Sequence, residues 1–89
     1  MDNTNQLGSF IDQIRWLHEV EYGDFKRKVG LYLTRLEKSL DAEKLRAVRD
    51  VIAQIRQDVI FNNKDDIEFA RRRTLELAEL IRARLNVRH

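Results

Sequence analysis

The 89-residue sequence contains no cysteine, no proline and only three glycines. The absence of cysteine excludes disulfide bonds, thiolate nucleophiles and every cysteine-ligated zinc or iron–sulfur site. The absence of proline, together with 36% charged residues, is typical of long uninterrupted helices. A chain of this length makes one domain, residues 1–89, and we expect residues 1–8 to form a flexible N-terminus.

Long apolar segments and catalytic motifs are also missing. No stretch approaches the roughly 20 apolar residues that a membrane-spanning helix requires, and the N-terminus does not resemble a secretory signal. The histidines are His18 and the terminal His89, no serine lies in a nucleophile motif, and no glycine-rich loop could hold a phosphate. We therefore expect a cytoplasmic protein without enzymatic activity, cofactor or membrane association.

Two acidic segments are candidates for metal binding or acid–base chemistry. His18 and Glu21 are three residues apart, so on a helix they would share a face and could bind a divalent metal. A di-iron bundle, however, needs Glu-x-x-His on two helices, whereas here the order is reversed and occurs once. Asp65 and Asp66 lie in a predicted turn and are typical of helix capping. The sequence therefore predicts no metal site.

The helices of the C-terminal half are clearly marked. Asp41 is a good N-cap, and after it five apolar residues recur at alternating spacings of three and four: Leu45, Val48, Ile52, Ile55 and Val59. Asn63 or Asp65 could cap a last helix of about residues 64–86. Its inner face would comprise Ile67, Ala70, Thr74, Leu77, Ala78, Ile81 and Leu85. Phe69, Leu80 and Val87 widen this face, which indicates contact with two neighbours.

The N-terminal third allows two interpretations. Apolar residues stay in helical phase across Gly23, which favours one long helix from Ser9 to Ser39. The alternative ends a helix at Gly23 and starts the next with Asp24 as its N-cap. The long helix is preferred because glycine costs only about 1 kcal/mol inside a helix. The expected fold is therefore all-α, an antiparallel three-helix bundle with a long first helix, or four helices if Gly23 breaks it. Gly30 is expected to permit a close helix approach.

Two basic runs suggest nucleic-acid binding. Three consecutive helical residues diverge by about 100° each, so Arg71–Arg73 form no patch, and nearby glutamates can pair with them. The run near residue 27 is different, because its cations lie opposite the expected core with Leu31 among them. This stripe comprises Arg27, Lys28, Leu31, Thr34, Arg35 and Lys38. It lacks aromatic stacking platforms and a helix-turn-helix spacing, so nucleic-acid binding is the second choice.

Charge is divided along the expected first helix. Residues 1–24 carry one basic residue against five acids, a net charge of −4, whereas residues 25–40 carry five basic residues against one acid, a net charge of +4. Trp16, Val20 and Leu31 are expected on the outer side of this rod. Two rods packed antiparallel would pair acidic with basic halves and bury Trp16 near Leu31 of the partner. The alternative is that the last helix covers Trp16 within one chain.

These patterns indicate a non-enzymatic protein–protein interaction or regulatory module, for example a small regulator, an inhibitor or immunity-type protein, or an assembly subunit. The expected partner is a second copy of the chain, and another protein is possible. The expected binding surface comprises Trp16, Val20, Arg27, Leu31, Arg35 and Lys38. The alternative function is nucleic-acid binding through the basic stripe of the first helix.

Overall fold

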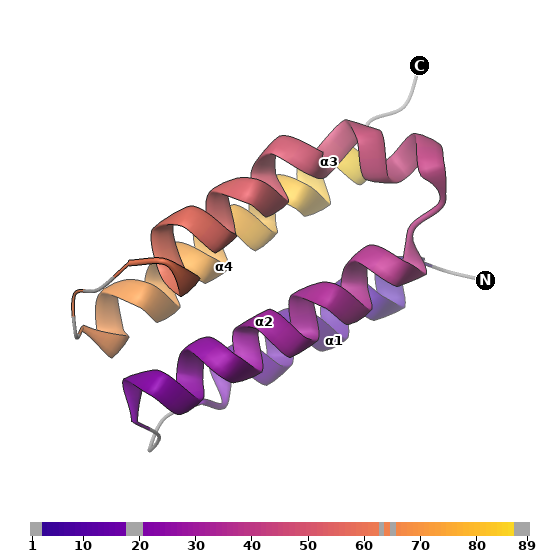
Figure 1. Cartoon of the computed structure of the whole chain (residues 1–89). Coiled ribbons are helices and arrows are strands. Elements are labelled where there is room, and N and C mark those ends of the chain that lie inside the picture. The colour runs from indigo at the N-terminus through magenta and orange to yellow at the C-terminus, as the bar shows by residue number, and fades with distance from the viewer. Residues whose placement is uncertain (1–2, 18–20, 63, 65, 87–89) are drawn as a thin grey trace.

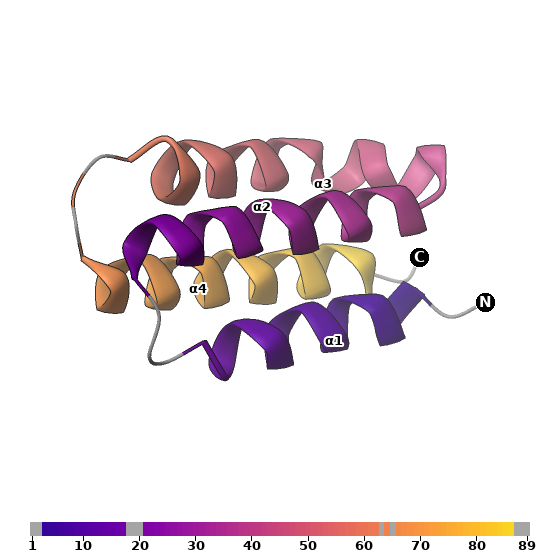
Figure 2. The same cartoon turned by 60° about the horizontal axis from the view of Figure 1, so that its bottom comes forward.

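A computed structural model describes residues 3–17, 21–62, 64 and 66–86, which form four helical rods. They are α1 (Asn3–Arg15), α2 (Tyr22–Ser39), α3 (Ala42–Ile55), which continues into the short π-helix η1 (Arg56–Ile60), and α4 (Ile67–Leu85). Successive rods run in opposite directions, so that α1 begins and α4 ends at the same end of the bundle (Figures 1 and 2). The all-α prediction is confirmed, and the bundle has four helices rather than three.

The predicted continuous helix from Ser9 to Ser39 is wrong. The chain leaves helical geometry after Arg15, and α2 starts at Tyr22 with Glu21 as its N-cap. Gly23 lies inside the first turn of α2, so a break at Gly23 gives the right number of helices but places the boundary too late. The Glu21 side chain makes no capping hydrogen bond, and therefore no capping motif in the sequence marks this boundary.

The first helix also begins earlier than expected, at Asn3 rather than Ser9, so residues 3–8 belong to α1 instead of a flexible N-terminus. Five apolar side chains on or just after α1 are buried in the core: Leu7, Phe10, Ile11, Ile14 and Leu17. Burying each contributes about 1.5–3 kcal/mol. A continuous first helix would leave these side chains overhanging the bundle in water, and folding back at residues 16–21 buries them instead.

The remaining core follows the predicted helix faces. The buried residues of α2 are Phe25, Val29, Leu33 and Leu36, and those of α3 and η1 are Val48, Val51, Ile52, Ile55 and Val59. α4 buries Ala70, Thr74, Leu77, Ala78 and Ile81, while Ile67 and Leu85 are partly buried. α4 packs against two neighbouring helices, α1 and α3, as predicted. The residues predicted to widen its inner face do not make this contact, because Phe69 and Leu80 are exposed and Val87 lies outside the described residues.

Side-chain caps fix the starts of α3 and α4. Asp41 accepts a hydrogen bond from the Lys44 backbone N–H at 2.9 Å, as predicted. The cap of α4 is Asp66, which accepts from the Phe69 backbone N–H at 3.0 Å, and α4 therefore starts at Ile67 rather than near residue 64. The predicted caps Asn63 and Asp65 lie outside the described residues.

Gly30 lies where α2 meets η1, but its lack of a side chain is not needed for this contact. A Cβ added there would be 3.6 Å from Ile60 Cδ1, an ordinary van der Waals distance, so the expected close approach is wrong. Because alanine has the higher helix propensity, Gly30→Ala is expected to raise the free energy of unfolding by about 0.5–1 kcal/mol. Urea denaturation measures this change. A lower unfolding free energy in Gly30→Ala would contradict the ordinary van der Waals spacing between Gly30 and Ile60.

Candidate binding surface on the second helix

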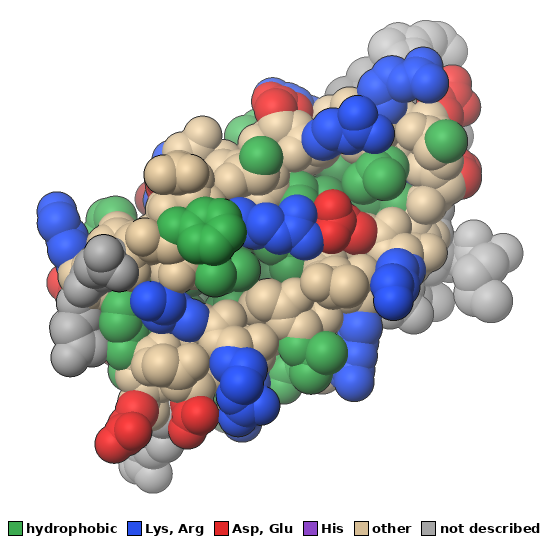
Figure 3. Space-filling model, in the orientation of Figure 1, with side chains coloured by type: hydrophobic (Ala, Val, Ile, Leu, Met, Phe, Trp, Pro, Cys, Tyr) green, Lys and Arg blue, Asp and Glu red, His purple; other side chains and the backbone are tan. Residues whose placement is uncertain are grey.

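The outer face of α2 carries four of the six residues predicted for binding: Arg27, Leu31, Arg35 and Lys38. All four are exposed, and Leu31 retains 46% of its accessible surface although it is a large apolar residue. They recur at spacings of three and four residues, so they occupy one side of the helix over about 16 Å at 1.5 Å per residue. In Figure 3, Lys and Arg side chains follow α2, with hydrophobic side chains between them.

Most cations of this face have no acid partner. Arg27 pairs with Asp24 at 3.3 Å, while Lys28, Arg35 and Lys38 form no ion pair with any residue that the structure describes. Glu37 turns away from the outer face and forms a two-pronged ion pair with Arg56 of η1. The outer face of α2 therefore keeps an excess of positive charge around Leu31.

The other two predicted residues do not join this face. Trp16 is 78% exposed, so no other helix covers it, but it lies in the turn after α1 and not on the helix that carries Leu31. Val20 lies outside the described residues. Because the chain folds back between Arg15 and Tyr22, α1 with Asp12 packs beside α2, whereas Glu21 and Asp24 lie at the start of α2 itself. The predicted rod with an acidic and a basic half is therefore wrong.

Trp16 instead borders an open groove of about 790 Å³ along α1. Its other lining residues are Gly8, Ser9, Asp12, Gln13 and Leu17, with Tyr32 from α2 and Arg82 from α4. The groove contains one acid and one base and is open to solvent, so it has no cluster of groups that would bind a particular class of ligand.

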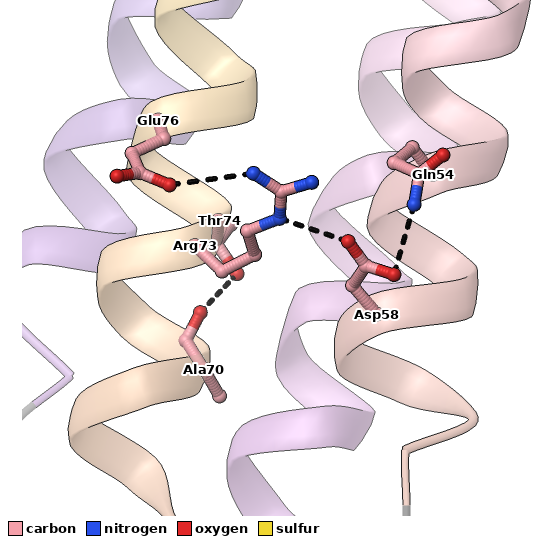
Figure 4. Close-up of polar contacts among 6 residues, drawn as sticks. All are labelled: Gln54, Asp58, Ala70, Arg73, Thr74 and Glu76. Atoms are coloured by element: carbon pink, nitrogen blue, oxygen red, sulfur yellow. Dashed lines mark hydrogen bonds and ion pairs between the residues drawn. The ribbon is translucent and has the colours of Figure 1, made fainter.

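The face between α3 and α4 differs from that of α2 because its charges are paired (Figure 4). Arg73 Nε donates to Asp58 Oδ2 at 2.8 Å, and Gln54 Nε2 donates to the other carboxylate oxygen at 2.9 Å. Arg73 Nη1 also donates to Glu76 Oε1 at 3.4 Å. Nearer the other end of α3, Arg84 Nη1 donates to Asp50 Oδ1 at 2.6 Å. The contacts of Arg73 with Asp58 and of Arg84 with Asp50 join α4 to the rod of α3 and η1, and the paired charges are less available to a partner.

The same contacts lower the pKa values of two carboxyl groups. Hydrogen bonds from Gln54 and then from Arg73 hold the pKa of Asp58 below its ordinary value of 3.8, because both stabilise the ionised form. A hydrogen bond from Arg84 lowers the pKa of Asp50 in the same way. A carboxyl whose pKa is lowered on folding stabilises the fold above its unfolded pKa and loses that contribution as pH falls through the folded pKa.

Acid titration of stability tests this assignment. Between about pH 5 and pH 2.5 we expect the unfolding free energy of Asp58→Asn to fall less steeply than that of the unchanged chain, because the variant has no Asp58 carboxylate to protonate. Urea denaturation at each pH measures the slope. The control is Asp12→Asn, which removes an exposed carboxylate on α1 and so corrects for the loss of one negative charge. Equal slopes for Asp58→Asn and the unchanged chain would contradict the assignment.

The described residues hold no group of three or more His, Asp or Glu side chains that could bind a metal ion. Of the metal-binding pair considered from the sequence, Glu21 is exposed at the N-terminus of α2 and His18 lies outside the described residues. In the part of the chain that the structure describes, no helix combines the length and the apolar character needed to cross a membrane.

One exposed aromatic residue, Phe61, is not predicted by any pattern in the sequence. Phe61, directly after η1, is 65% exposed, and its backbone N–H donates to the Arg56 carbonyl at 2.9 Å. This five-residue spacing is that of a π-helix, whose wider turn changes the direction of the side chains that follow. Apolar spacing alone does not predict such a turn, so only the exposed position of Phe61 in the structure identifies it.

The outer face of α2, with its exposed Leu31 and unpaired cations, is thus the best candidate binding surface. Comparison with known proteins does not identify the chain, since no family model, no curated protein and no solved structure matches it.

Proposed function

We propose that this protein is a non-enzymatic protein-interaction module and that the outer face of α2 is its binding surface. The observation that supports the proposal most is the exposed Leu31 between Lys28 and Arg35, which form no ion pair within the described part of the chain. Protein interfaces combine apolar anchors with arginine and charge complementarity. By contrast, Arg73 and Arg84, the cations of α4 that face the α3 rod, form ion pairs with Asp58 and Asp50 within the fold.

The partner that we propose is a different protein rather than a second copy. The homodimer expected from the sequence paired the acidic half of one rod with the basic half of another, and the rod does not exist. Two copies meeting antiparallel through α2 around Leu31 would place Arg35 of each copy opposite Arg27 of the other. Like charges in close contact oppose association, so a surface with excess acid is the better complement.

Photo-crosslinking in the native cell tests this proposal. A benzophenone amino acid placed at position 31 is expected to give a discrete crosslinked protein, because Leu31 would lie inside the interface. The matched control is position 80 on α4, where Leu80 is similarly exposed at 42%. Adding Arg35→Glu and Lys38→Glu to the position-31 variant should abolish the product. Absence of a product at position 31, or the same products at both positions, would refute the proposal.

A further inference from the structure

The exposed Phe61 extends the basic face of α2 across to the neighbouring rod. The carbonyl oxygen of Asn62, the next residue, accepts hydrogen bonds from Tyr22 Oη at 3.2 Å and from Lys26 Nζ at 3.3 Å. Lys26 Nζ also lies 5.0 Å from the centre of the Tyr22 ring. These contacts fix the backbone beside Phe61 to the first turns of α2, so the exposed ring has a defined place next to the basic face.

Polar contacts hold η1 itself against the same turns of α2. Tyr22 Oη donates to the Val59 carbonyl at 3.3 Å, and Val59 is fully buried. A π-helical turn is less stable than an α-helical one and is frequent at functional sites. Here it leaves Phe61 exposed directly after a well-packed segment, so its ring is accessible to a partner.

Cations from α3 complete this face. Arg49 precedes Arg56 by seven residues, two turns of a helix, so both lie on the side of the rod from which Arg56 reaches Glu37 of α2. Arg49 is exposed and has no acid partner among the described residues. Figure 3 shows Lys and Arg side chains on both rods of this face, with hydrophobic side chains between them. We call this surface the α2–α3 face and define it by Arg27, Leu31, Lys38, Arg49 and Phe61.

We propose that the α2–α3 face binds an acidic amphipathic helix of another protein. This inference rests on the proposed function and names the chemistry of the partner. Acids on one edge of such a helix would neutralise Lys38 and Arg49, and its apolar residues would cover Leu31 and Phe61. α2 is about 27 Å long at 1.5 Å per residue, which matches a partner helix of about 18 residues.

Two other occupants fit this face less well. A nucleic-acid duplex would use the cations, but its phosphates would lose water against Leu31 and Phe61 without gaining a polar contact there. A second copy would present the same excess of positive charge. An acidic helix satisfies the charges and the apolar side chains at once.

Selection from a displayed library tests the proposal without knowledge of the natural partner. The probe is a library of 18-residue amphipathic helices whose polar positions are randomised among Glu, Lys, Gln and Ser. We expect the selected peptides to be rich in Glu and to bind the folded chain more weakly as salt increases. Selection of Lys-rich or uncharged peptides, or binding of a DNA or RNA duplex more tightly than of any selected peptide, would overturn the inference.

Substitutions then establish whether the selected peptides use the α2–α3 face. Phe61→Ser, and separately Lys38→Glu combined with Arg49→Glu, should each weaken binding by about 10- to 30-fold, as expected for an interface anchor or a pair of charge contacts. The matched controls on α4, Phe69→Ser and Arg72→Glu, should leave binding within about twofold. Circular dichroism verifies that each variant is folded. Equal losses in variants and controls would overturn the inference.

The outcome is separable from that of the crosslinking experiment. A crosslinked product at position 31 together with selected peptides that are not acidic would support the proposed interaction function but contradict the proposal that the partner is an acidic helix. Acidic peptides that bind through the α2–α3 face without any cellular product at position 31 would support the chemistry of the site and reject the proposed cellular role.

Discussion

Phe10→Ala is expected to lower the free energy of unfolding by about 3–5 kcal/mol, the usual cost of truncating a buried phenylalanine. Phe10 is only 2% exposed, and its ring is among the largest fully buried side chains of the molecule. Small single domains have a total unfolding free energy of about 5–15 kcal/mol, so this change would remove a large part of it. Urea denaturation followed by circular dichroism measures the loss.

The result also distinguishes the observed fold from the one that the sequence favours. In a bundle with one long first helix, Phe10 would lie on the overhanging turns, and its truncation would change stability by less than about 1 kcal/mol. Trp16→Ala is the matched control, since Trp16 is a larger aromatic residue but is mostly exposed. A loss at Phe10 no greater than that at Trp16 would contradict the packing of α1 against α2 and α4.

The C-terminal half was predictable because local and tertiary preferences agree there. In α3, the Asp41 cap precedes a regular apolar seam, and both are present in the structure. In α4, five of the predicted inner residues are buried, and Ile67 and Leu85 are partly buried. Phe69 and Leu80, which were predicted to widen this face, are exposed. The start of α4 was also misplaced, because several residues between Asn62 and Asp66 are suitable caps and the sequence does not rank them.

The break between α1 and α2 was not predictable by the same reasoning. The segment from Trp16 to Glu21 contains no glycine or proline and no capping motif, and the apolar phase continues across it. Local preferences therefore leave the helix intact. The break is decided by the free energy gained when the apolar side chains of α1 are buried, which requires the chain to fold back. This burial depends on the positions of the other helices, which the local sequence does not specify.

The candidate site was predictable to the same extent as the helix that carries it. The outer position of Arg27, Leu31, Arg35 and Lys38 depends only on their phase relative to the buried residues of α2, and it is confirmed. The grouping of Trp16 with Leu31 failed because it depended on a continuous helix. The exposure of Phe61 could not be predicted from the sequence, because the π-helical turn before it depends on packing against α2.

Ion pairs within one helix could be predicted from the sequence, whereas those between helices could not. Arg71 pairs with Glu68, and Arg73 with Glu76, each three residues apart, as the helical spacing predicts. The pairs that join different rods, such as Arg73 with Asp58 and Arg56 with Glu37, depend on the register between helices. Sequence spacing within one helix contains no information on that register.

Ala78→Leu is expected to lower the free energy of unfolding by about 1–3 kcal/mol, because additional methylene groups in a close-packed core force neighbouring side chains out of their preferred conformations. Ala78 is fully buried on the face of α4 that packs against both α1 and α3, so no side of the larger residue could turn to water. Ala83→Leu, on the exposed side of the same helix, is the control and should change stability by less than about 0.5 kcal/mol. Equal stability of the two variants would show that α4 is not enclosed by two neighbours, and the four-helix packing would then be wrong.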